Sequence, residues 1–236
     1  MTTFRHIELS LDTTYAPSEQ KHFTRSSRCI CNYLETSLAS LLFQSPYSRL
    51  IIHCSRDPQA IWVKPLKRDP FLEVCIKFDL PPMDSLTPEA LQRQFIQIIL
   101  SGLESATTFT PMPVDFCLKT LRNFESGGFV NRWLHLDKRW ERWKCRCTIS
   151  AELTTEHFSL DQLVYVDGHL LASRRIAETK PREGLFVDYL GDISISSQGI
   201  IKYKKGNKVL TAFDLQGRQF VVPPPTPDSP PSAPHG

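Results

Sequence analysis

Short segments in which apolar and polar residues alternate predict strands in the first part of the chain. Apolar side chains recur at every second position in segments 7–11 and 72–78. Because successive side chains of a strand point to opposite faces, each segment predicts a strand with one buried face. Leu50–Cys54 is a continuous apolar run of strand length and predicts a further strand.

Other segments repeat their apolar residues at intervals of three and four, which is typical of amphipathic helices. The first, 30–42, follows a polar stretch and ends before Pro46. A second helix is expected to begin at Thr87, a capping residue, and a third near Pro113. The third should end at the glycine pair 127–128, because glycine readily adopts the backbone of a helix C-cap.

From Trp143 onward the pattern indicates strands. Alternation over 143–153 is the clearest periodic signal in the chain, with one apolar and one polar face. Hairpins are expected at three pairs of turn residues: Asp167-Gly168, Gly206-Asn207 and Gln216-Gly217.

The order of these elements predicts an α+β fold in three parts. Residues 1–126 form an N-terminal half of mixed helices and strands, and residues 127–222 form an antiparallel, β-rich half. Residues 223–236 contain seven prolines and almost no large apolar side chains. We therefore expect this tail to be disordered or polyproline-like.

Composition narrows the class of protein. Apolar residues make up 41% of the 236-residue chain, enough for a sizeable core, and the formal net charge is only +3. No apolar run is long enough to span a membrane, and the N-terminus lacks the pattern of a secretory signal. We expect a cytoplasmic protein that does not associate with membranes.

The seven cysteines do not suggest a disulfide framework, because their number is odd and they lie in apolar segments. Two pairs, Cys29 with Cys31 and Cys145 with Cys147, have one residue less between them than zinc knuckles use. We interpret them as buried, reduced side chains rather than as a metal or redox site.

The motifs of common enzymes are missing. The sequence has no glycine-rich phosphate loop, no H-E-x-x-H, no G-x-S-x-G and no kinase motifs. His53 and Cys54 are the nearest local pair for nucleophilic catalysis, but neighbours on a strand point to opposite faces. We therefore expect no enzymatic activity and no cofactor, although a catalytic site assembled from distant residues remains an open alternative.

Segment 127–146 is the most unusual part of the chain. It contains three of the four tryptophans, and residues 132–146 carry six Lys and Arg against two acids. Three interpretations are open: tryptophans that anchor a core under lysine and arginine stems, a surface that recognises a protein, or a site that binds nucleic acid by stacking and phosphate contacts.

Several short sequence segments together resemble the immunity proteins of bacterial polymorphic toxin systems. They are Ser101-Gly102-Leu103-Glu104 at a helix end, Phe124-Glu125-Ser126-Gly127-Gly128-Phe129, Asn131-Arg132-Trp133-Leu134-His135 and the cysteine-containing strand. The resemblance covers about residues 4–192 and identifies no subfamily. It implies a small cytoplasmic protein that binds one cognate toxin and blocks it, without chemistry or a cofactor of its own. Immunity proteins against nucleases are often acidic, and this chain departs from that at +3.

The resemblance identifies no binding motif in this sequence. We therefore choose the candidate interface residues from their own chemistry. Large contact area combined with charge selects six partner-binding candidates: Arg132, Trp133, His135, Arg139, Trp140 and Arg142. The expected partner is a cognate protein toxin. The alternative is a nucleic acid bound by segment 132–146.

Overall fold

The computed structural model describes residues 1–57, 62–65 and 70–222, so the predicted tail lies outside the described residues. The chain forms two compact units, Met1–Asn131 and a second that begins at Arg132. The sequence places the boundary after residue 126. Asn131 belongs to the first unit because its buried amide donates to the Cys29 carbonyl oxygen at 2.8 Å and to Asn32 Oδ1 at 3.1 Å.

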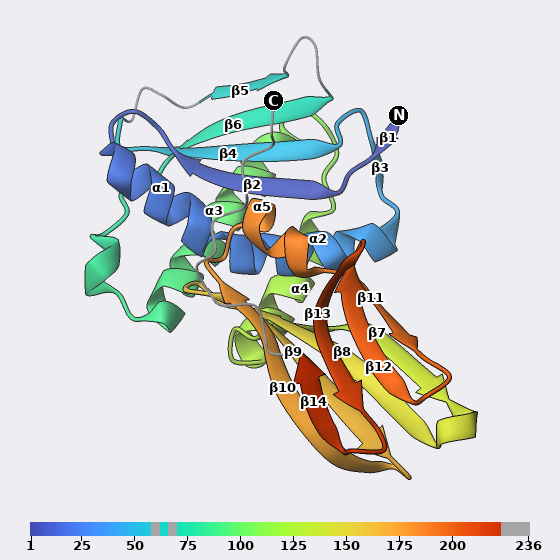
Figure 1. The fold of residues 1–236 in the computed structure, drawn as a ribbon. Helices are drawn as coiled ribbons and strands as arrows, with labels where there is room; N and C mark the ends of the chain where they lie inside the picture. Colours follow the sequence, from blue (N-terminus) through green and yellow to red (C-terminus); the bar gives the residue numbers. More distant parts are fainter. Residues whose placement is uncertain (58–61, 66–69, 223–236) are drawn as a thin grey trace, which may run out of the picture. The chain divides into compact units, whose positions relative to one another are not determined.

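The first unit contains a four-stranded mixed sheet (Figure 1). Its strands, in spatial order, are β2 (His6–Leu11), β4 (Arg49–Ser55), β6 (Phe71–Lys77) and β5 (Trp62–Pro65). The first three are parallel, and β5 is antiparallel to β6. A separate two-stranded sheet joins β1 (Thr2–Thr3) to β3 (Gln44–Ser45). The predicted strands over 7–11, 50–54 and 72–78 are confirmed, and the alternate residues Ile7, Leu9 and Leu11 are buried.

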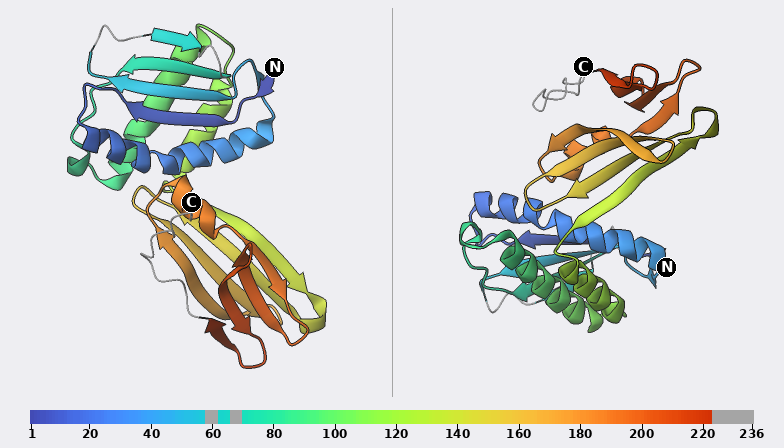
Figure 2. Two further views of the ribbon diagram at one scale, coloured as in Figure 1. Left: turned by 45° about the horizontal axis from the view of Figure 1, so that its top comes forward. Right: turned by 90° about the horizontal axis from the view of Figure 1, so that it is seen from below.

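Helices cover one face of this sheet (Figure 2). They are α1 (Pro17–Ser26), α2 (Arg28–Leu41), α3 (Pro88–Thr107) and α4 (Val114–Ser126), with a short 3₁₀ turn η1 (Met83–Ser85). The first three contact the strands, and α4 packs on α2 and α3. Both predicted caps are confirmed: Thr87 Oγ1 accepts the Ala90 N–H at 3.2 Å, and Gly128 after α4 has a φ of +75°.

The second unit is a sandwich of two four-stranded sheets. One has the order β10 (His169–Thr179), β9 (Phe158–Val166), β8 (Cys145–Leu153) and β7 (Asn131–Trp140). The other has the order β11 (Asp192–Ile195), β12 (Ile200–Lys205), β13 (Lys208–Asp214) and β14 (Gln219–Val222). The remaining elements are η2 (Glu141–Trp143), α5 (Glu183–Phe186) and η3 (Val187–Tyr189).

The three predicted hairpins are confirmed. Asp167 and Gly168 have φ values of 50° and 83°, the left-handed backbone that a type I′ turn requires at both positions. The described pairings of this unit are all antiparallel, so the α+β class with a β-rich second half is confirmed.

The core of the sandwich contains buried polar contacts made by Gln162. Thr211 donates its hydroxyl to Gln162 Oε1, and Gln162 Nε2 lies 3.3 Å from Cys147 Sγ. Gln162 and Thr211 are both fully buried, between apolar side chains that include Ile149, Leu160 and Phe213. All seven cysteines are buried and free, as predicted.

Within the described residues, no helix is long and apolar enough to cross a membrane.

Candidate functional site

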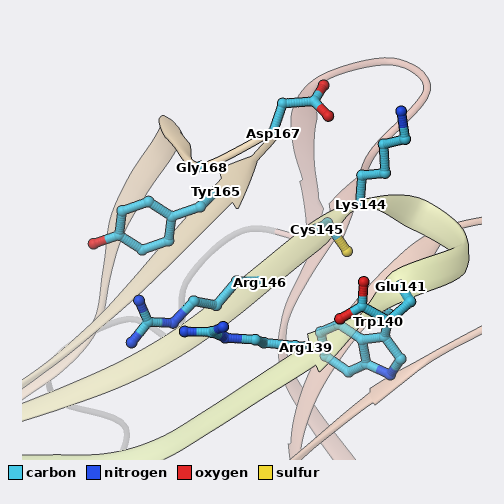
Figure 3. A pocket seen from close by; sticks show the side chains of 9 residues that line it. All are labelled: Arg139, Trp140, Glu141, Lys144, Cys145, Arg146, Tyr165, Asp167 and Gly168. Carbon is cyan, nitrogen blue, oxygen red and sulfur yellow. The ribbon is translucent and has the colours of Figure 1, made fainter.

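The candidate site is a pocket of about 390 Å³ in the second unit (Figure 3). It lies where the turn after β7 meets the hairpin turn after β9. Its lining residues are Arg139, Trp140, Glu141, Lys144, Cys145, Arg146, Tyr165, Asp167 and Gly168. The lining therefore combines three cations, two acids and two large aromatic side chains.

Local backbone geometry builds this pocket. The 3₁₀ turn η2 ends β7, and Lys144 then adopts a left-handed φ of 45° so that the chain can enter β8. The Lys144 N–H donates to the Glu141 carbonyl oxygen at 3.0 Å, and the Lys144 carbonyl oxygen accepts the Asp167 N–H at 2.9 Å. These hydrogen bonds fix the two turns to each other, so the pocket forms without a ligand.

One of the three cations in the pocket is already paired. Arg146 donates two hydrogen bonds to Asp137, Nε to Oδ1 at 2.8 Å and Nη2 to Oδ2 at 2.7 Å. These bonds, with the nearby charges of Arg146 and Arg139, lower the pKa of Asp137 and keep it ionised. Arg146 also lies over the ring of Tyr165, 5.7 Å from its centroid.

Arg139 and Lys144 are exposed, and in the described part of the chain neither has an ion-pair partner among the acids. Arg139 and Arg146 both line the pocket, and in the view of Figure 3 their side chains extend in the same direction. This end of the pocket is therefore positively charged, while Glu141 and Asp167 supply carboxylates elsewhere in its lining.

The structure brings two of the six sequence candidates, Arg139 and Trp140, into the pocket. Arg142 is exposed just outside the lining, 5.6 Å from the centre of the Trp143 ring. Trp143 in turn packs on Gly199, where an added Cβ would lie 2.9 Å from the indole. Trp143 thus anchors η2, while Trp140 remains half-exposed at the pocket.

The other three candidates lie on β7 away from the pocket and contact residues of their own unit. Arg132 is exposed and pairs with Glu152. Trp133 is half-buried with its ring 6.1 Å from that of Phe158, and His135 Nε2 lies 3.2 Å from the Gly191 carbonyl oxygen. Half of the predicted set therefore lies outside the pocket, in contacts within the second unit.

Seven lining residues were not among the sequence candidates: Glu141, Lys144, Cys145, Arg146, Tyr165, Asp167 and Gly168. Arg146 pairs with Tyr165 in the register of β8 and β9, so the two side chains share the outer face of the sheet. Two features of the sequence could have indicated these lining residues: the alternation of β8 and the Asp167-Gly168 turn.

The pocket offers little for a metal or redox cofactor. Burial raises the pKa of the Cys145 thiol, which keeps it protonated. Among the described residues no cluster of three or more His, Cys, Asp and Glu side chains has a geometry suited to a metal ion. The arrangement is suited to recognising charged and planar groups.

A second polar cluster lies in the first unit, on the sheet face that carries no helix (Figure 2). Ser10 Oγ is 2.6 Å from His53 Nδ1, and His53 Nε2 is 3.7 Å from Glu73 Oε1. Glu73 also pairs with Lys64 at 3.2 Å. Cys54 is fully buried, which confirms that it points away from His53. The contact of His53 with Glu73 is too long for a hydrogen bond.

No protein-family model matches the chain, and comparisons with curated proteins and with solved structures find no match.

Proposed function

We propose that the chain is a non-enzymatic protein-binding module, an immunity protein that binds a cognate bacterial toxin in the cytoplasm and covers its active site. The observation that carries this proposal is the preformed pocket beside β7, which is lined by arginine, lysine and aromatic side chains. The sequence resemblance to immunity proteins supports the same function.

The pocket has the composition of a protein-recognition site. Trp, Tyr and Arg dominate the energetically important positions of protein interfaces, and Trp140, Tyr165 and Arg139 lie together here. The hydrogen bond between the two turns fixes their backbone, so little ordering entropy would be lost on binding.

Edge strand β7 extends this surface beyond the pocket. It is the last strand of its sheet, and its outward side chains include exposed Leu134, whose relative exposure is 54%. A partner that covers the pocket could therefore also contact Leu134 along the strand. The inhibition of the toxin would be steric, because this chain, when bound, would cover the toxin's active site and exclude its substrate.

The test is to capture the partner and then measure protection. The tagged chain is purified from its native cells after nuclease treatment, at moderate salt, and co-purifying proteins are identified. A single stoichiometric protein whose toxicity is relieved by co-expression of this chain is the expected result. If no protein is retained, and no toxin encoded beside the gene is neutralised, the proposal is wrong.

Substitutions in and beside the pocket test whether this surface binds the partner. Arg139→Gln and the double change Trp140→Ala with Arg142→Ala should weaken capture, while Arg132→Gln on the same strand should retain it. Circular dichroism and thermal unfolding of each variant separate loss of binding from loss of folding. Arg139→Gln is the safer probe, because Arg139 is exposed.

A second candidate function, nucleic-acid binding, is favoured by one observation. Arg139, Arg142 and Lys144 are exposed within a segment that has six cations and two acids. Nucleic acid bound by these residues should be released steeply by salt, because each phosphate contact releases counterions. Nuclease-sensitive, salt-sensitive ultraviolet absorbance in the purified sample would favour this function over the first.

A further inference from the structure

The positively charged end of the pocket has one carboxylate for two guanidinium groups. Asp137 accepts two hydrogen bonds from Arg146 and is the only acid within ion-pair distance of Arg146 among the described residues. Arg139 also lines the pocket, and its charge is near enough to Asp137 to help lower the pKa of that carboxyl (Figure 3). The donor groups of Arg139 are therefore available to a ligand.

The geometry of this end is fixed before any ligand arrives. The two hydrogen bonds to Asp137 set the plane of the Arg146 guanidinium, and the ring of Tyr165 lies beneath it. Arg146 uses Nε and Nη2 on Asp137, so Arg139 supplies the paired N–H donors with which a guanidinium binds a carboxylate, and Arg146 supplies a fixed positive charge at the same pocket. We propose that Arg139 and Arg146 form an anion subsite that receives one carboxylate side chain from an acidic loop of the partner protein. This inference rests on the proposed protein-binding function.

The lining favours a single carboxylate over a phosphate chain. Glu141 and Asp167 also line the pocket, so a ligand with a charge at every unit would meet two like charges there. An acidic loop can place one carboxylate at Arg139 and neutral or basic groups near Glu141 and Asp167. Mixed charge of this kind is complementary to a protein surface.

The distribution of charge between the two units agrees with an acidic partner. Residues 132–236 carry 15 Lys and Arg against 12 Asp and Glu, whereas residues 1–131 carry 13 of each. The net positive charge of the chain therefore belongs to the unit that contains the pocket. Attraction of an acidic loop to this unit would raise the association rate at low salt.

The test uses the purified full-length chain and needs no partner. The indole N–H signals of the ¹⁵N-labelled protein are recorded by NMR, and Trp140→Phe assigns the signal of Trp140 in the pocket. The probe is an N-acetylated, C-amidated Gly-Glu-Gly-Gly peptide, which carries a single carboxylate, with the matched Gly-Gln-Gly-Gly peptide as control. We expect the Trp140 signal to shift saturably with the glutamate peptide alone. Arg139→Gln should weaken this binding about tenfold, as expected for loss of a central charged contact.

The control variant Lys208→Gln removes the same charge from an exposed position that does not line the pocket. It should change the affinity less than about twofold, because an exposed charge outside the site acts only through screened, long-range attraction. Equal weakening by Arg139→Gln and Lys208→Gln would overturn the subsite, as would a Trp140 signal that does not respond to the peptide.

A thymidine oligonucleotide is titrated in a parallel sample. If it moves the Trp140 signal at lower concentration than the peptide does, the assignment to a carboxylate is wrong. Failure of the subsite is distinguishable from failure of the proposed function. A captured toxin whose affinity does not depend on Arg139 contradicts the subsite and the role of the pocket but not the immunity function, whereas specific peptide binding without any captured protein contradicts only the immunity function.

Discussion

Asp167 donates its backbone N–H to the carbonyl oxygen of Lys144 at 2.9 Å, and this hydrogen bond joins the turn after β7 to the turn after β9. Both residues have a left-handed backbone, with φ values of 50° and 45°. Two segments separated along the sequence thus form one rigid corner. The pocket opens beside this corner, so the backbone of the two strand turns determines where its charged side chains lie.

The salt bridge inside the first unit predicts an acid-dependent stability. Burial alone would raise the pKa of Glu35, but contacts with His6, Arg28 and the Ile7 N–H outweigh it and the pKa is lowered. The Arg28 contact measures 2.9 Å and the Ile7 contact 3.1 Å. Glu35→Gln should lower the free energy of unfolding by about 2 kcal/mol at pH 7, as expected for loss of hydrogen bonds to a buried charge.

The sign of this pH dependence follows from the lowered pKa. The folded state binds the Glu35 proton less tightly than the unfolded state, so the stabilisation is complete above the unfolded pKa of about 4.3. It is lost as the pH falls through the lower folded pKa. Urea unfolding should therefore show a smaller difference between wild type and Glu35→Gln at pH 3 than at pH 7. A difference that is constant with pH would contradict this role of Glu35.

Because α3 packs closely on β4, we predict that one methyl group added at Gly102 lowers the free energy of unfolding. A Cβ at Gly102 would lie 2.4 Å from Ile52 Cδ1, 2.6 Å from Cγ1 and 2.9 Å from Cγ2, so no single side-chain rotation removes the overlap. Gly102→Ala should cost about 1–3 kcal/mol by overpacking. Exposed Ser101→Ala in the same helix should cost nothing measurable, because alanine favours the helix.

A double variant tests the cause of this effect. Ile52→Ala removes the atoms that the new methyl group would meet, so the double change should cost less than the sum of the two single changes. Additive costs in chemical unfolding would show that Gly102 is required for another reason.

The buried hydrogen bond between Thr211 and Gln162 predicts a selective loss of stability. Thr211→Val keeps the volume but leaves Gln162 Oε1 without its donor inside the sandwich. An unsatisfied buried acceptor costs about 1–3 kcal/mol. Thr211→Ser keeps the hydroxyl and should recover the hydrogen bond, apart from the cost of one missing methyl group. Equal stability of Thr211→Val and wild type in urea would contradict this contribution.

Burial of the cysteines predicts unreactive thiols. Burial raises the pKa of Cys31, Cys117 and Cys147 to about 12, so their thiolate forms are scarce at neutral pH. The native protein should react negligibly with Ellman's reagent at pH 8, and all seven thiols should react in guanidinium chloride. A thiol that reacts rapidly in the native protein would indicate a site that the fold does not explain.

Periodicity predicted the helices and strands in which apolar and polar residues recur at regular intervals. The alternation of β8 and the capping residues of α3 were sufficient, because local sequence and tertiary packing agree there. The sequence did not predict α1, whose buried residues are only Phe23 and Ser26, or the short edge strand β5. Helix α3 also continues to Thr107, past the end expected near Glu104.

The site was predictable only in part for a physical reason. Arg139 and Trp140 stand out by residue type within one segment, but Tyr165 and Asp167 join them through strand register and a hydrogen bond between turns. Trp133 and Trp143 have the same residue type as Trp140 and contact Phe158 and Gly199 instead. Residue chemistry alone does not distinguish a tryptophan that packs on its own unit from one that lines a pocket.

The most direct test of the central claim is the affinity of the captured partner for wild type, Arg139→Gln and Arg132→Gln, measured by calorimetry at physiological salt. Binding by the pocket predicts that Arg139→Gln weakens affinity at least about tenfold, as for an interface hot spot, while Arg132→Gln stays close to wild type. Equal affinities for all three proteins, each with wild-type thermal stability, would contradict the claim that this pocket is where the protein binds its partner.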